Sequence, residues 1–261
     1  MIPLSVQLRS LRLPFRKALQ TAGELGADGI EIDLRNELRP EDLSQTGIRH
    51  LKKILSDYNL KVASVSFPTR RGYNVLEDLE RRVAATKTAM TAAYDLGAKV
   101  LVNRIGGIDP DMEAETNGRL LEVLDDLARH ADICGVTFAA KTGQVDGPVM
   151  KEFLDKLPEG AIGVDFDPGA LIINGFSADE SYQALSKYVV NVRGKDGVKD
   201  LARGRGIEVP LGRGTVDFQW LIASLEEARY RGFITIEREH PEHPVQEVSD
   251  GLEYLRNVQI P

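Results

Sequence analysis

At 261 residues, with 42% hydrophobic and 28% charged residues, the chain has the composition of an ordinary globular protein. Its formal net charge of −7 argues against general affinity for nucleic acid or anionic lipid. The single cysteine, Cys134, excludes an internal disulfide framework and favours a reducing compartment. No apolar run approaches the roughly 20 residues of a membrane span, and the first residues lack a signal-peptide pattern. We therefore expect a cytoplasmic protein with no membrane or nucleic-acid partner.

Eight short runs rich in β-forming residues alternate with longer segments of helical periodicity. Several of the runs are apolar at successive positions, which is typical of strands covered on both faces. We predict strands at Leu4–Leu8, Gly29–Asp33, Lys61–Ser66, Lys99–Asn103, Val136–Ala140, Ile162–Phe166, Val189–Val192 and Ile234–Glu237.

The segments between these runs carry apolar residues at spacings of three and four, as in 15–25, 120–131 and 218–225. Gly26 and Gly97 are placed to end a helix just before the next strand. Repeated right-handed crossovers close most naturally into a barrel of ~250 residues. The sequence therefore predicts an α/β fold, a (β/α)8 TIM barrel forming one domain over residues 1–261. An open doubly wound sheet is the alternative, but no glycine-rich phosphate loop follows the first strand.

The longest irregular stretch, Lys195–Val216, connects the last two predicted strands and is rich in glycine and arginine. Structureless loops of that length are usually functional or disordered. Its arginines add to the charged residues discussed next; they are Arg203, Arg205 and Arg213.

Charged residues follow nearly every predicted strand, at the end where barrel enzymes place their active sites. Many are arginines, whose planar guanidinium suits phosphate or carboxylate. An acidic protein that gathers cations at its mouth would attract an anionic ligand, although charged loops can also merely solvate a rim. The cations predicted to bind substrate are Arg35, Arg71, Arg104, Lys195 and Arg213.

Five motifs in this order and spacing carry a resemblance that covers essentially the whole chain. They are Gly-Ala-Asp-Gly-Ile-Glu-Ile at 26–32, Gly-Val-Asp-Phe-Asp-Pro-Gly at 163–169, Val-Arg-Gly-Lys-Asp at 192–196, Leu-Gly-Arg-Gly-Thr-Val-Asp-Phe at 211–218 and Gly-Phe-Ile-Thr-Ile-Glu at 232–237. With them the chain resembles the xylose-isomerase-like TIM barrels, specifically the sugar phosphate isomerase/epimerase family.

That family holds a divalent cation with a Glu, an Asp, a His and a Glu ending strands five to eight. The resemblance places Asp167 and Glu237 at the positions on strands six and eight. It places Lys141 at the strand-five position, Arg193 at the strand-seven position, and Ala170 where a further His often stands. An ammonium or guanidinium group cannot ligate a metal. We therefore expect no metal cofactor, with Lys141 and Arg193 neutralising Asp167 and Glu237 instead.

The resemblance implies an isomerase or epimerase that acts on, or binds, a small anionic sugar or polyol derivative. Proton transfer beside a carbonyl needs a base and a group that stabilises the developing oxyanion. Glu237, alternating with Asp167, is the predicted base. Lys141 and Arg193 are predicted to hold the oxygens that a metal holds in relatives.

Several alternatives remain open at this stage. Lys141 could form a Schiff base in an aldolase or dehydratase, or the barrel could have lost the reaction and only bind carbohydrate. The four charged residues could also be a structural ion-pair plug; a lysine facing a hollow would favour chemistry. His240 and His243 could recruit a metal with Glu237 or Glu239. Apurinic endonucleases are distant relatives of the family, but the chain has only four histidines. Association into a homo-oligomer is undecided.

Overall fold

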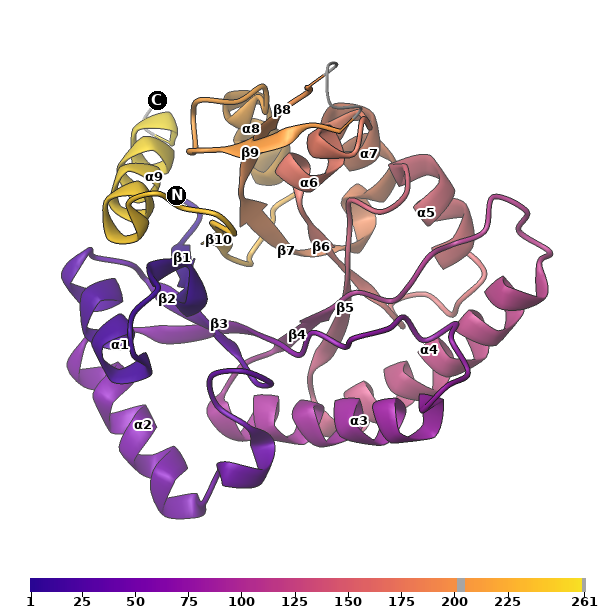
Figure 1. Ribbon diagram of the computed structural model, residues 1–261, viewed down its shortest axis with the longest axis horizontal. Helices are drawn as coiled ribbons and strands as arrows, with labels where there is room; N and C mark the ends of the chain where they lie inside the picture. Colours follow the sequence, from indigo (N-terminus) through magenta and orange to yellow (C-terminus); the bar gives the residue numbers. More distant parts are fainter. Residues whose placement is uncertain (201–204, 260–261) are drawn as a thin grey trace.

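The computed structural model of this chain describes residues 1–200 and 205–259. Eight parallel strands close into a barrel in the order β1-β10-β7-β6-β5-β4-β3-β2, with helices around it (Figure 1). The predicted (β/α)8 TIM barrel is thereby confirmed. The barrel strands are β1 (Leu4–Gln7), β2 (Gly29–Asp33), β3 (Lys61–Ser66), β4 (Val100–Asn103), β5 (Thr137–Lys141), β6 (Gly163–Phe166), β7 (Val189–Gly194) and β10 (Ile234–Ile236).

The helices follow the strands in the expected alternation and bury their apolar faces against the barrel. Gly26 and Gly97 have φ values of 74° and 86°, so both glycines end helices as predicted. The main helices are α1 (Phe15–Glu24), α2 (Gln45–Asp57), α3 (Leu79–Leu96), α4 (Glu115–Cys134), α5 (Gly147–Leu154), α6 (Pro168–Ile173), α7 (Ala178–Leu185), α8 (Phe218–Glu227) and α9 (Pro244–Val258). Short 3₁₀ turns are η1 (Leu8–Leu11), η2 (Pro40–Asp42) and η3 (Ser186–Tyr188). Within residues 1–200 and 205–259, no helix is long and apolar enough to cross a membrane.

The stretch predicted to be irregular, Lys195–Val216, contains a two-stranded antiparallel sheet, so that prediction was wrong in part. β8 (Asp196–Val198) pairs with β9 (Ile207–Val209). The Asp196 carboxylate accepts backbone N–H bonds of 2.9–3.2 Å from Gly197, Gly212, Gly214 and Val216. One buried side chain therefore organises a segment whose composition indicated a loop. Arg203 lies outside the described residues.

The barrel interior is polar, whereas the helix-facing side of the strands is apolar. Alternate residues of a strand share a face, and the inward residues include Glu31, Asp165, Asn191 and Thr235, all at most 1% exposed. They bond across strands: Ser5 Oγ lies 2.7 Å from Thr235 Oγ1, and Asn191 donates to Asp165 at 2.7 Å. Two positions further along the chain, the same inward faces carry the charged residues of the mouth: Asp33 on β2, Asp167 just beyond β6, Arg193 on β7 and Glu237 just beyond β10.

Candidate active site at the barrel mouth

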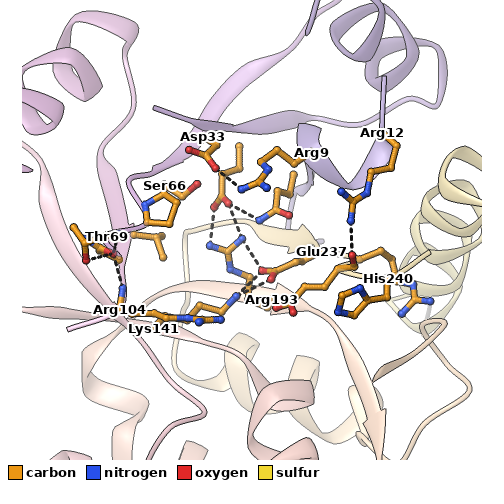
Figure 2. Close-up of a pocket in the computed structure, with 17 residues that line it drawn as sticks. Arg9, Arg12, Asp33, Ser66, Thr69, Arg104, Lys141, Arg193, Glu237 and His240 are labelled. Atoms are coloured by element: carbon orange, nitrogen blue, oxygen red, sulfur yellow. Dashed lines mark hydrogen bonds and ion pairs between the residues drawn. The ribbon is translucent and has the colours of Figure 1, made fainter. Parts of the chain in front are cut away.

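A cavity of about 390 Å³ opens at the C-terminal end of the barrel strands. Figure 2 shows Lys141, Arg193 and Glu237 meeting near its centre, with Thr69 and Arg104 to one side and Arg12 and His240 to the other. Four of the predicted site residues line this cavity: Arg104, Lys141, Arg193 and Glu237.

The other predicted residues lie elsewhere. Asp167 does not line the cavity but contacts Lys141. Lys195 does not line the cavity either, and its side chain is buried, with 4% of its surface exposed. Arg35 and Arg71 line a neighbouring cavity rather than the mouth. Arg213 is exposed and lines neither cavity. The structure therefore does not bring all the predicted substrate cations together.

Lys141, at the end of β5, lies between the two carboxylates that the resemblance assigns to a metal. Its Nζ is 2.8 and 2.7 Å from the two carboxylate oxygens of Glu237 and 3.1 Å from Asp167 Oδ2. Its side chain keeps 12% of its surface exposed, toward the cavity. Asp167 is fixed independently, because it caps α6 by accepting the Ala170 N–H at 2.8 Å.

Arg193 lies deeper, and its pairing differs from the prediction. Its Nε is 2.9 and 2.8 Å from the two carboxylate oxygens of Asp165, and its two terminal nitrogens lie 2.9 and 2.7 Å from Glu31. It reaches Glu237 only at 3.2 Å, and no contact joins it to Asp167. Burial alone would lower the pKa of Arg193, but Asp165, Glu31 and Glu237 raise it well above its ordinary value.

Lys195 is a third cation in the network that the comparison of metal ligands did not include. Its Nζ lies 2.6 Å from Glu239 Oε1, 3.5 Å from Glu237 Oε1 and 3.8 Å from Asp167 Oδ2. Burial alone would lower the pKa of Lys195, but Asp167, Glu237 and Glu239 raise it above its ordinary value. The mouth therefore holds three charged cations against a larger set of carboxylates.

Glu237 contacts all three of these cations. Burial alone would raise the pKa of Glu237, but Lys141, Lys195 and Arg193 hold it well below its ordinary value. A general base works best when its pKa lies near the working pH. Glu237 is therefore a weak base while all three contacts persist, which counts against the role predicted for it.

The residues at this site do not fit the divalent metal that the family resemblance implies. The Lys141 ammonium lies within 3.1 Å of both remaining ligand candidates, so a cation is already held between them. In the ranges the structure describes, no group of three or more His, Cys, Asp or Glu side chains is placed to hold a metal ion. His240 lines the cavity, whereas His243 stands at the start of α9 and does not.

The rim of the cavity carries further cations in different states of pairing. Arg9 donates to Asp33 at 2.6 Å, and Arg12 donates to the Glu239 carbonyl. The Arg104 guanidinium has no hydrogen-bond or ion-pair partner among residues 1–200 and 205–259, and it is exposed at the cavity edge. Arg104 is therefore the rim cation most available to an anionic ligand.

Sequence reasoning missed Glu31 as a member of the site. Its two carboxylate oxygens accept from Gln7 at 3.0 Å, from Ser64 at 2.8 Å and from Arg193. The signal was present, since Glu31 is a carboxylate that stands between Ile30 and Ile32 within a predicted strand. A buried carboxylate in such a strand requires a cation nearby.

The family described as xylose isomerase-like TIM barrel matches this chain over residues 19–258. A xylose isomerase domain protein from Planctomyces limnophilus shares 24% identity, covers 92% of each chain and gives a TM-score of 0.83. A xylose isomerase-like TIM barrel protein from Mycobacterium smegmatis, solved in complex with magnesium, shares 19% identity, covers 99% of this chain and 96% of that chain, and gives a TM-score of 0.78. A D-allulose 3-epimerase from Methylomonas sp. shares 20% identity, covers 98% of each chain and gives a TM-score of 0.75. At these identities the likeness is one of fold, and no curated protein matches the chain.

Proposed function

Because this chain belongs to the xylose isomerase-like TIM barrel family, we propose that it is an isomerase- or epimerase-like protein for a small anionic carbohydrate, with Lys141 in place of the metal. One observation carries the proposal. The Lys141 ammonium contacts Asp167 and Glu237 and still lines the open cavity, so its charge is both held in position and accessible. A lysine sealed inside a filled plug would have favoured a purely structural role.

The chemistry begins with a substrate carbonyl oxygen that accepts a hydrogen bond from Lys141, while Glu237 takes the proton from the neighbouring C–H. An ammonium at this point stabilises negative charge that develops on that oxygen when a neighbouring C–H is deprotonated. When the substrate oxygen replaces Glu237 as the partner of Lys141, Glu237 loses one of its three cations and becomes a stronger base. Arg104 binds the anionic end of the substrate at the rim.

A barrel that binds the carbohydrate without converting it is the second candidate. The low pKa of Glu237 favours it, because a carboxylate held by three cations is a poor proton acceptor. The Schiff-base alternative has less support: a nucleophilic lysine must be free to attack a carbonyl, whereas the Lys141 Nζ already contacts two carboxylates within 3.1 Å.

The test compares binding and proton exchange in the same samples. Protein freed of metal by chelation is incubated in D₂O with hexuronates, sugar monophosphates and neutral hexoses, and NMR follows both ligand binding and deuterium incorporation. We expect anionic sugars to bind, neutral sugars to bind weakly, and deuterium uptake to stop in Lys141→Met. A matched control is Arg231→Gln, which changes an exposed cation on the chain before β10.

The outcomes separate the candidates. Binding without exchange supports the non-catalytic barrel. Exchange that appears only after manganese or magnesium is added refutes the metal-free mechanism. Borohydride trapping of a sugar on the wild type but not on Lys141→Met would restore the Schiff-base alternative.

A further inference from the structure

A second cavity of about 790 Å³ lies beside the mouth, between the loops that follow β2 and β3. Its lining is dominated by arginine, in a protein whose net charge is −7. Three acidic residues also line it: Glu41, Glu77 and Asp78. The six arginines, which we call the arginine groove, are Arg35, Arg39, Arg70, Arg71, Arg81 and Arg82.

Half of these arginines are not used to hold the protein together. Arg71 pairs with Glu77, and Arg35 donates to the Pro68 carbonyl at 2.9 Å. The guanidinium groups of Arg39, Arg70 and Arg81 have no hydrogen-bond or ion-pair partner in the part of the chain that the structure describes. Three unpaired guanidinium groups around one cavity repel each other, and an anion bound between them would remove that repulsion.

Arg82 adds a buried donor to the groove. Its terminal nitrogens donate to the carbonyls of Glu77 and Val75, while its Nε is buried without a hydrogen-bond partner. A buried unsatisfied donor costs free energy comparable to a lost hydrogen bond. The bonds that Arg82 does make hold the backbone at Val75 and Glu77, beside the groove.

The loop after β3, which carries Arg70 and Arg71, is anchored to the barrel rather than free. Tyr73 is fully buried, and its hydroxyl lies 2.7 Å from Thr86 Oγ1 and 2.8 Å from Asn103 Nδ2. Gly72 lies so close to Gly106 that a Cβ added at Gly72 would stand 2.3 Å from the Gly106 Cα. Arg70 and Arg71 are therefore presented by a fixed loop, which lowers the ordering cost of binding.

The groove and the mouth share one residue. Thr69 lines both cavities, and its N–H and hydroxyl lie 3.2 and 3.4 Å from Asn103 Oδ1. The two cavities therefore adjoin at Thr69, and a ligand long enough to reach across this residue would have one end in each. The groove has about twice the volume of the mouth, more than a single phosphate requires.

We propose that the arginine groove binds the diphosphate of a diphosphate-linked sugar whose sugar end lies in the mouth. Arginine suits this ligand because each guanidinium binds two phosphate oxygens at once. The assignment of the sugar end rests on the function proposed above, whereas the anion site does not depend on it.

The first test uses inorganic pyrophosphate and isothermal titration calorimetry. We expect the double variant Arg39→Ser/Arg81→Ser to weaken pyrophosphate binding about tenfold or more, because two charged contacts are lost. The matched control is Lys52→Gln/Arg231→Gln, which removes two cations from a basic cavity of about 650 Å³ lined by the chain before β10. Equal losses in both variants, or no binding to the wild type, would overturn the anion site.

The second test uses uridine diphosphate glucuronate, a probe that carries both the diphosphate and an anionic sugar. It should bind more tightly than pyrophosphate and lose affinity in Arg39→Ser/Arg81→Ser and also in Arg104→Ser. Pyrophosphate binding that persists while the sugar adds no affinity would refute the shared ligand and leave the groove as an anion site. Lys141→Met should still bind pyrophosphate while its proton exchange is abolished. Loss of pyrophosphate binding in the wild type would therefore count against the groove alone, and absence of proton exchange in the wild type would count against the proposed function alone.

Discussion

Replacing Arg193 with methionine would break the most deeply buried part of the charge network. The guanidinium is 1% exposed and holds Glu31 and Asp165, both fully buried, at 2.7–2.9 Å. Methionine fills much of the same space but supplies no charge. Two carboxylates would then be left in the barrel interior without their cation.

The loss of stability in Arg193→Met is set by the two buried carboxylates that remain rather than by the guanidinium that is removed. Removing one partner of a buried ion pair costs about 3–5 kcal/mol, because the other charge stays buried and uncompensated. For a domain of this size each kcal/mol lowers Tm by about 2–4 °C, so we expect Arg193→Met to lower Tm by roughly 6–20 °C. The Tm of Arg193→Lys should lie between the Tm values of the wild type and Arg193→Met, because lysine keeps the charge but lacks the planar guanidinium.

The pH dependence tests the reason for the loss. Burial raises the pKa of Asp165 above its ordinary value, and Arg193 opposes that rise. Removing Arg193 raises this pKa further, so the folded variant is stabilised when Asp165 binds a proton. That stabilisation is lost as the pH rises through the pKa of Asp165 in the folded state. The difference in Tm between variant and wild type should therefore shrink as the buffer is taken from pH 8 to pH 5.

Thermal melts followed by circular dichroism at both pH values measure this prediction. The control is Lys187→Met, which removes an exposed partner of Asp155 at 2.9 Å and should barely change Tm. A Tm loss in Arg193→Met no larger than in the control, or one that grows at pH 5, would refute the reasoning.

Three further perturbations test other parts of the structure. Lys141→Glu places a carboxylate beside the two it now contacts, so manganese should raise the Tm of this variant but not of Lys141→Gln or the wild type. Gly72→Ala forces a Cβ to within 2.3 Å of the Gly106 Cα, and we expect urea unfolding to show a loss of about 1–3 kcal/mol. Asp196→Ala leaves four backbone N–H groups without their acceptor, so limited proteolysis within 197–216 should be roughly tenfold faster. An Asp196→Ala protein cleaved at the wild-type rate would show that the carboxylate does not hold this segment.

The fold could be predicted because its signals are local and repeated. Each barrel strand lies within two residues of its predicted bounds at either end, since apolar runs bounded by glycine or polar residues mark strands covered on both faces. The hairpin of β8 and β9 could not be predicted in this way. It depends on the backbone N–H groups of two glycines, 16 and 18 residues away from Asp196, converging on one carboxylate, a contact that no local pattern encodes.

The site could be predicted only in part, for a reason that is geometric. Strand-end position correctly brought Lys141 and Glu237 together, because parallel strands in a barrel end at one face. The same rule does not say how far a side chain reaches or in which direction its loop turns. Arg71 therefore lies in the arginine groove, and Arg213 is exposed away from both cavities.

The charge network divides into a sealed half and an accessible half, and the two halves make different predictions. Arg193, Glu31 and Asp165 are each at most 1% exposed, although Arg193 and Glu31 line the cavity, and a well-packed apolar cluster in their place would serve stability equally well. Lys141, by contrast, is 12% exposed and faces the cavity with Glu237. The Arg193 contact to Glu237 at 3.2 Å links the halves, so the sealed half fixes the carboxylate that the accessible half presents. Stability should therefore respond mainly to Arg193, and ligand binding to Lys141; a protein in which both substitutions changed only stability would have an ion-pair plug rather than an active site.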